Sequence, residues 1–243
     1  MNVSSQSSAT RAGQAPKAEG VGLGELARSL WSPAPEMLED KFLVYRHFTV
    51  FLYGLYTVIG PGLWLWDYVL DPVGAMDTVP FRLGYLSFAA AGYVFFIARN
   101  LRFLGIFSTI YLLSVISAFT VLLNRLAGGF TSGIGGYMYF QIMAVLFFQC
   151  FSLRWNIFFV VAASLVPHLI AVMGFAPGFQ HAQYAVLIWP ACVGSLLVQV
   201  FSAYLYLRNY TLRAELQRSE EKLRVSGEKY KGLVETSANG IWI

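Results

Sequence analysis

Hydrophobic residues gather into six long runs that short polar breaks separate. A helix needs roughly 17 to 25 residues to cross the ~30 Å hydrocarbon layer of a bilayer, and each run has about this length. The pattern therefore predicts an all-α membrane protein, a six-transmembrane-helix bundle. The predicted spans are Leu43 to Trp66, Phe81 to Ala98, Phe103 to Leu123, Gly135 to Leu153, Trp155 to Met173, and Tyr184 to Leu207.

The sixth run turns polar after Leu207 but keeps the composition of a helix. The stretch LRNYTLRAELQRSEEKLRVSGEKYKGLVE has no proline and is rich in helix formers. We therefore expect the last span to continue as a long cytoplasmic exit helix, with a coiled-coil-like linker at residues 209–235. A plain solvated helix is the competing interpretation. Five residues at heptad positions a and d are the expected signal relay: Leu212, Leu216, Leu223, Tyr230 and Leu233.

Charged residues are rare and lie mostly outside the runs. The 243 residues are 57% hydrophobic and 12% charged, and no Asp or Glu lies between Asp77 and Glu215. Lysine and arginine favour the cytoplasmic side in short loops, and most of them lie there if the N-terminus is inside. We therefore predict a multi-pass protein with both termini cytoplasmic. Asp67, Asp71 and Arg82 then belong to the first outer loop.

Residues 1–40 are predicted to be a disordered cytoplasmic tail. They are rich in Ser, Ala and Gly and lack the apolar core of a cleavable signal peptide, and only GELARSLW has the pattern of a short helix. The net charge of +4 does not indicate nucleic-acid binding, because most basic residues flank the spans or alternate with Glu. No nucleic-acid partner is expected.

Ionisable groups are almost absent from the predicted spans, which excludes several classes of membrane protein. No lysine is placed to bind retinal, and the lack of intramembrane carboxylates disfavours a carboxylate-coupled transporter or pump. His47 and His168 lie at different depths, about 6 and 20 Å from the inner ends of their helices, which disfavours a haem between them. Cys150 and Cys192 also differ in depth and indicate no disulfide or metal site. We expect no metal and no cofactor.

A few polar and aromatic residues remain in the predicted outer half of the bundle. Tyr137 and Gln141 are four residues apart, as are Ser164 and His168, so each pair shares a helix face. Prolines 167 and 190 predict helix bends beside them, which favours a cavity, although ordinary cross-helix packing is the alternative. The glycine-rich GGFTSGIGG is interpreted as a turn, with a mobile lid as the alternative. The predicted ligand-binding residues are Tyr137, Gln141, Ser164, His168, Trp189, Cys192 and Ser195.

The C-terminal stretch EKYKGLVETSANGIWI resembles the start of a PAS domain. In that pattern a helix ends near Tyr230 to Glu235, a Ser-Ala-Asn-Gly turn follows at Ser237 to Gly240, and the first strand begins at Ile241. The resemblance implies that residues 236–243 open a PAS domain that is truncated here.

The membrane part, from Tyr53 to Asn209, resembles the six-helix sensor region of quorum-sensing histidine kinases that detect α-hydroxyketone autoinducers, the cholera autoinducer receptor type. The resemblance rests on WLWDYVLDP, FRLGYLSFAAAGYVFF, the basic break at Arg99 to Arg102, the helices through Arg154, MGF, and LYLRNY. The chain departs from that family because a PAS start replaces the kinase dimerisation helix, and no phosphoacceptor histidine box occurs.

These resemblances imply a receptor module in a bacterial inner membrane. Residues 41–208 would sense a small lipophilic, autoinducer-like molecule among membrane lipids, and a homodimer would pass the signal to a PAS domain and an output enzyme. A two-component sensor histidine kinase is the leading output, with a diguanylate or adenylate cyclase as the alternative. A passive dimerising anchor and a transporter are the remaining readings. The 243 residues themselves contain no recognisable catalytic domain.

Overall fold

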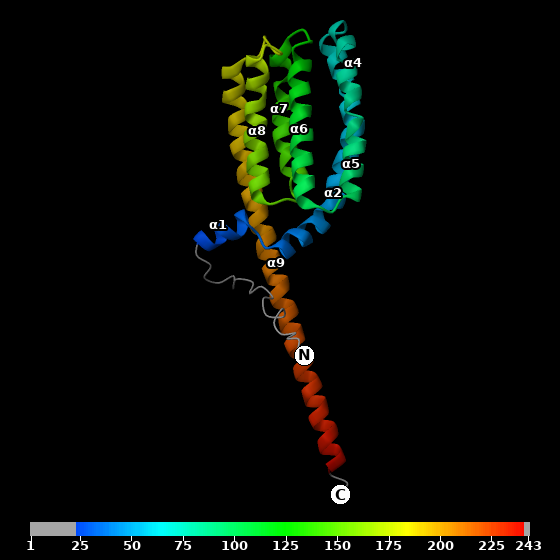
Figure 1. The fold of residues 1–243 in the computed structure, drawn as a ribbon, viewed down its shortest axis with the longest axis vertical. Coiled ribbons are helices and arrows are strands. Elements are labelled where there is room, and N and C mark those ends of the chain that lie inside the picture. The colour runs from blue at the N-terminus through cyan, green and yellow to red at the C-terminus, as the bar shows by residue number, and fades with distance from the viewer. Residues whose placement is uncertain (1–22, 241–243) are drawn as a thin grey trace, which may run out of the picture. The chain divides into compact units, whose positions relative to one another are not determined.

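The computed structural model describes residues 23–240, and in that range the chain forms nine helices and no strand (Figure 1). Six helical segments there are long and apolar enough to cross a membrane, which confirms the all-α membrane bundle. The helices are α1 (Leu23–Trp31), α2 (Pro35–Gly62), α3 (Trp64–Leu70), α4 (Gly74–Gly84), α5 (Ser87–Ile97), α6 (Leu101–Leu123), α7 (Gly129–Phe147), α8 (Leu153–Val172) and α9 (His181–Gly240).

The first two spans are longer than the hydropathy pattern predicted. The first runs from Pro35 to Leu70 through α2 and α3, and the second runs from Gly74 to Ile97 through α4 and α5. Proline at the first position of α2 explains the early start, because its missing N–H is not needed in the first turn. The charged residues expected in the first outer loop are therefore largely helical.

The chain divides into two units, and residues 28–203 form the membrane bundle. Within the bundle α2 packs against α5 and α4, while α6, α7 and α8 pack against one another (Figure 1). Contacts of α2 with α7 and of α4 with α6 join these two groups. The ends of the helices then form a basic end, with Arg46, Arg99, Arg102 and Arg154, and an opposite end, with the loops at 71–73, 124–128 and 173–180.

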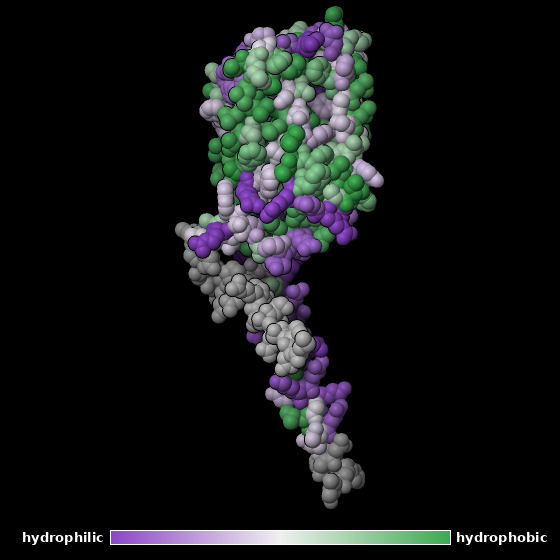
Figure 2. Space-filling model, in the orientation of Figure 1, coloured by the Kyte–Doolittle hydropathy of each residue, from purple (hydrophilic) through white to green (hydrophobic). Residues whose placement is uncertain are grey.

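The outside of the bundle is apolar, as a lipid-facing surface must be. Figure 2 shows hydrophobic residues covering most of the bundle between more polar ends. Val58, Val172 and Val186 are more than 70% exposed, whereas Tyr53 and Phe88 are fully buried inside. Because water cannot satisfy backbone groups in lipid, helices are the expected solution for such a chain.

The glycine-rich stretch between the third and fourth spans is mostly helix, not loop. Gly128 and Gly129 have positive φ angles of 81° and 48° and make the turn, and α7 begins at Gly129. A Cβ atom at Gly133 or Gly136 would collide with a side chain of α6. The glycines therefore let α6 and α7 approach closely, as small residues do in membranes.

The second unit comprises residues 1–27 and 204–243, of which the structure describes 23–27 and 204–240. The short helix expected for GELARSLW is present as α1, so part of the predicted disordered tail is helical. Helix α9 continues to Gly240, so the turn expected at Ser237 to Gly240 is absent. The strand predicted from Ile241 lies outside the described residues.

Candidate functional site

Helix α9 carries a buried polar face that bonds to both neighbouring helices. The Ser195 hydroxyl donates to the backbone oxygen of Gln141 at 3.2 Å, and the Asn156 amide donates to Gln199 Oε1 at 2.7 Å. One turn further on, the Ser202 hydroxyl donates to Gln149 Oε1 at 3.0 Å. Spacings of four and three residues put these α9 side chains on one helix face. We call this set of buried polar residues, together with the bonded pair Ser164 and Cys192, the polar seam. Its eight members are Gln141, Gln149, Asn156, Ser164, Cys192, Ser195, Gln199 and Ser202.

The seam is buried but not fully hydrogen-bonded. Asn156 is 1% exposed, and Gln199 and Gln141 are each 2% exposed. Asn156 Oδ1, Gln199 Nε2 and Gln141 Oε1 have no hydrogen-bond partner among the described residues. Two amides joined by one bond leave one carbonyl and one NH₂ unused, whichever way the amides are oriented. In a dry interior each such group costs free energy, so the seam favours a further polar partner.

An aromatic cluster lies at the end of the seam that is further from the basic end of the bundle. Tyr184 of α9 packs edge-on against Tyr137 of α7, with ring centroids 5.0 Å apart, and against His168 of α8 at 5.1 Å. Phe179, in the loop before α9, packs edge-on against Phe130 of α7 with ring centroids 4.7 Å apart, and it also contacts Tyr184 at 5.2 Å. The Tyr137 hydroxyl donates to Thr120 of α6 at 2.9 Å, so it is satisfied within the protein.

The His168 and His181 rings form a pair that the sequence did not predict. Their Nδ1 atoms are 2.8 Å apart and the rings are nearly parallel, with centroids at 5.0 Å. One ring must donate the proton and the other accept it. His181 is the first residue of α9, and His168 lies in the last turns of α8. Among the described residues no group of three or more metal-ligating side chains occurs.

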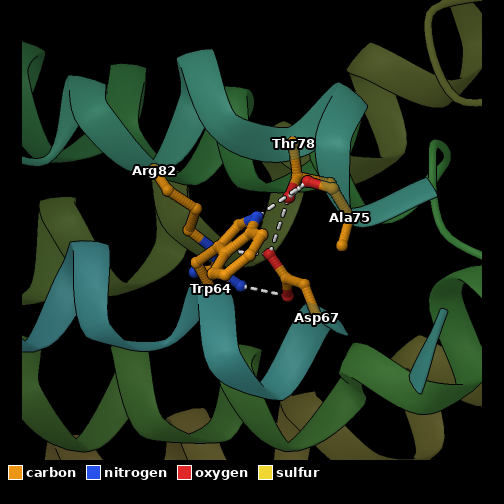
Figure 3. A network of polar contacts seen from close by, with 5 residues as sticks. All are labelled: Trp64, Asp67, Ala75, Thr78 and Arg82. Atoms are coloured by element: carbon orange, nitrogen blue, oxygen red, sulfur yellow. Dashed lines mark hydrogen bonds and ion pairs between the residues drawn. The ribbon is translucent and has the colours of Figure 1, made fainter. Parts of the chain in front are cut away.

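A buried ion pair joins the first two spans (Figure 3). It lies near the end of the bundle that is opposite the basic end. Arg82 donates from Nε and Nη2 to the two carboxylate oxygens of Asp67 at 2.7 and 2.6 Å, and Thr78 donates to the same carboxylate at 3.0 Å. Trp64 Nε1 donates to the backbone oxygen of Ala75 at 2.9 Å and closes the network. Asp67 and Arg82 are 1% and 5% exposed. The sequence pattern indicated that ionisable groups are almost absent from the spans, but this pair is buried within the first two spans.

Lys41 is a further buried ionisable group, near the basic end of the bundle. It lies on α2 and is 4% exposed. Its ammonium group donates to the backbone oxygen of Phe151 at 3.1 Å. The bond crosses from α2 to the α7–α8 connection at the basic end, so the lysine fastens this end of the bundle.

The sequence model of one family, MASE8, matches residues 65–217. The chain belongs to the MASE8 family. This is a family of membrane sensor-type domains, and the chain is a multi-pass membrane sensor module. No curated protein and no solved structure matches the sequence.

The MASE8 match begins at α3 and ends inside α9, so it contains the whole polar seam and the buried ion pair. It agrees with the membrane sensor region that the resemblance implied. The histidine kinase, the PAS domain and the quorum-sensing role stay predictions.

Five of the predicted ligand-binding residues are buried in this MASE8 bundle, and they pair across its helices. Gln141 and Ser195 are bonded, Cys192 lies beside Ser164, and Tyr137 belongs to the aromatic cluster. His168 and Trp189 lie further out, with ring centroids 6.1 Å apart, and Trp189 is 48% exposed. The residues form a strip along α7, α8 and α9.

The predicted depth of part of this strip was wrong. Because α7 begins at Gly129, Gln141 lies about 18 Å from the start of the helix and about 9 Å from its end. It therefore belongs to the half nearer the basic end, and so does its partner Ser195.

Sequence reasoning missed four seam residues, all nearer the basic end: Gln149, Asn156, Gln199 and Ser202. The signal was present, because Cys192, Ser195, Gln199 and Ser202 recur at spacings of three and four in an otherwise apolar run. A polar residue in such a run usually faces the bundle interior.

The predicted relay residues lie on the α9 segment of the other unit. Leu212 is 47% exposed, and the other four are between 60% and 71% exposed. An apolar row left open along a polar helix is what a coiled-coil partner requires. Arg224 pairs with Glu221 and Glu228 on the same helix at 2.7 and 2.9 Å, which stabilises the helix itself.

Proposed function

We propose that this MASE8 chain binds a small lipophilic signal molecule at the polar seam and transmits binding along α9 to a cytoplasmic output enzyme. The observation that carries the proposal is the buried pair of Asn156 and Gln199, which shares a single 2.7 Å bond and leaves one acceptor and one donor unused. The site is thus matched to an amphiphile that has one hydrogen-bond donor and one acceptor on an apolar body.

The surroundings of the seam suit such a molecule. Pockets for small ligands are mostly apolar and use a few placed polar groups for orientation. Here buried apolar surface is supplied by Phe148, directly after α7, which stacks on Phe159 of α8 at 4.6 Å, and by Ile188 of α9. An autoinducer-like compound with adjacent hydroxyl and carbonyl groups carries the required donor and acceptor.

Helix α9 is the proposed route of the signal. It holds three of the cross-helix bonds of the seam, and the same helix continues to Gly240. A ligand that bonds to the free groups of Asn156 and Gln199 would change the strength of the hydrogen bonding between α8 and α9. It would thereby favour one position or rotation of α9 over another. A state change of this kind needs differential contacts in the two states, which the half-satisfied seam provides.

The output follows from the resemblance at the C-terminus. We propose a homodimer in a bacterial inner membrane, with both termini cytoplasmic and the row Leu212, Leu216, Leu223, Tyr230 and Leu233 paired between copies. A PAS domain would follow, and then a sensor histidine kinase, with a diguanylate or adenylate cyclase as the alternative output.

Native mass spectrometry of the purified chain tests the binding step. We expect a small amphiphile to co-purify with the wild type and with Val198→Met, which changes a residue that is 55% exposed. Its occupancy should fall about ten-fold in Gln199→Met, because roughly 1.4 kcal/mol is lost with one hydrogen bond. Equal occupancy in both variants, or no bound amphiphile in any of them, would support a passive anchor instead.

A one-residue insertion after Ser219, made in the longer protein that carries the output domain, tests the relay step. It rotates everything beyond it by ~100°, so output should invert or disappear while amphiphile binding stays normal. A four-residue insertion adds close to one helical turn and serves as the control. Normal regulation after the one-residue insertion would make α9 a simple tether.

A further inference from the structure

A pocket of about 560 Å³ opens at the basic end of the bundle, away from the polar seam. It lies between the first turns of α2 and the α5–α6 connection. Arginines enter it from both sides, Arg46 from α2 and Arg99 and Arg102 from the connection and α6. Its lining residues are Pro35, Glu39, Phe42, Leu43, Arg46, Arg99, Asn100, Leu101 and Arg102.

The three arginines keep most of their hydrogen-bonding capacity unused. Only Nε of Arg46 is bonded, to the backbone oxygen of Phe95 at 3.0 Å, and its guanidinium lies over the rings of Phe42 and Phe96 at 5.6 and 5.5 Å. These contacts hold Arg46 in place. The Arg99 and Arg102 side chains are exposed and make no hydrogen bond or ion pair with any residue that the structure describes.

The pocket is therefore a preformed site for an anion. Glu39 is the one acidic lining residue against three arginines. The side-chain oxygen of Asn100 does not compete with an anion for the arginine side chains, since it already accepts from the backbone N–H groups of Arg102 and Phe103, both at 3.1 Å. Planar guanidinium groups bind phosphate through paired N–H donors, which favours a phosphate over a simple halide.

The walls of the pocket indicate that the anion has an apolar tail. Phe42, Leu43 and Leu101 line it beside the arginines. Just outside, Phe96, Ile97 and Phe103 are 54%, 57% and 49% exposed on the lipid-facing surface. A phosphate bound to the arginines would thus place an attached acyl chain along an apolar face.

We propose that this pocket binds the head group of an anionic glycerophospholipid, in the bilayer leaflet at the basic end of the bundle. The lipid phosphate bonds to Arg46, Arg99 and Arg102, and the acyl chains lie over the exposed apolar side chains of α5 and α6. The site is separate from the proposed signal site and does not depend on it.

Native mass spectrometry of the intact chain tests the proposal, with mixed micelles of phosphatidylcholine and phosphatidylglycerol as the probe. Wild type should retain phosphatidylglycerol selectively, and Arg99→Gln/Arg102→Gln should weaken its binding about 30-fold, at roughly five-fold for each basic residue. The control is Arg154→Gln/Arg208→Gln, which removes the same charge from exposed residues that do not line the pocket. It should keep selective binding, and all forms should keep the thermal midpoint of the wild type.

Three results would overturn the proposal. Equal loss of phosphatidylglycerol in both double variants would indicate general attraction to the charged end of the bundle. Equal retention of the two lipids by the wild type would remove the requirement for an anionic head group. Displacement of phosphatidylglycerol by millimolar inorganic phosphate would assign the pocket to a soluble phosphate compound.

Discussion

The hydrogen bond between Asn156 and Gln199 gives the sharpest test of how the bundle is held together. We consider Gln199→Met, which keeps the length of the side chain and removes its amide group, both the carbonyl oxygen and the NH₂. The Asn156 amide, which is 1% exposed, then loses its bond at 2.7 Å and has no partner among the described residues. The substitution therefore adds an unsatisfied group and removes a link between α8 and α9.

The size of the effect follows from these two contributions. Cross-helix hydrogen bonds in membranes contribute about 0.6 kcal/mol on average and up to about 1.7 kcal/mol, and leaving a buried polar group unpaired costs about 1 to 3 kcal/mol. We expect Gln199→Met to lower the free energy of unfolding by about 1 to 3 kcal/mol. Asn156→Leu should have a similar effect, because it leaves Gln199 unpaired instead.

The double variant separates the bond from the packing. When both amides are replaced by apolar groups, neither is left unpaired, so Asn156→Leu/Gln199→Met should be more stable than the sum of the single effects by at least about 1 kcal/mol. Unfolding by dodecyl sulfate in mixed micelles, followed by tryptophan fluorescence, measures all three variants. Val198→Met, at a position that is 55% exposed, is the control for methionine on α9.

Simple additivity of the two single effects would refute this reasoning. It would mean that the amides contribute separately, for example through lipid or water contacts, and that α8 and α9 are held together by packing alone.

Three further outcomes are expected. Arg82→Gln leaves the buried Asp67 carboxylate unpaired and should cost about 3 to 5 kcal/mol, partly recovered in Asp67→Asn/Arg82→Gln, as measured by the same titration. Three backbone N–H groups lower the pKa of the Asp71 carboxyl, so its contribution to the free energy of unfolding is complete above pH ~4 and is lost as the pH falls through the lowered pKa. The wild-type thermal midpoint should therefore drop on acidification, and that of Asp71→Ala should change less. Gly136→Ala places a Cβ against an α6 ring and should cost about 1 to 3 kcal/mol, whereas Gly135→Ala, with open space around it, should be neutral or stabilising.

The number and class of the membrane helices could be predicted because they depend on the length and hydropathy of each run. All six predicted spans have a counterpart in the structure. Their ends were less predictable, because polar residues at a span end can be satisfied inside the protein. Asp67 and Arg82 lie 15 residues apart and neutralise each other only once α3 and α4 have folded back on one another, which no local pattern reveals.

The candidate site was only partly predictable for a similar reason. Spacing rules identified Ser164 and His168, and Tyr137 and Gln141, as pairs on shared faces, but not the partner that each side chain has on a neighbouring helix. The partner of His168 is His181, across a loop, and that of Ser195 is a backbone oxygen of α7. Such partners depend on helix register, which a single sequence does not specify when most positions are apolar.

The polar bonds of the bundle differ in how completely they are satisfied, and this difference bears on the proposed mechanism. In the hairpin formed by α3 and α4, both Asp67 carboxylate oxygens accept hydrogen bonds from Arg82 and Thr78, and both of these partners are buried. Changing that arrangement would expose an unpaired charge to lipid, which costs several kcal/mol. The hairpin is therefore suited to stay fixed.

Helix α9, by contrast, is joined to α7 and α8 by single bonds between neutral groups, several of which keep unused donors or acceptors. Neutral amides and hydroxyls can exchange partners along a helix face at a cost of about 1 kcal/mol per bond. A ligand contributing one or two hydrogen bonds could supply a free-energy difference of that size, whereas it could not break the ion pair. Helix α9, which continues to Gly240, is thus also the helix whose contacts a small neutral molecule could alter, and this is the physical basis on which we propose it as the transmitter.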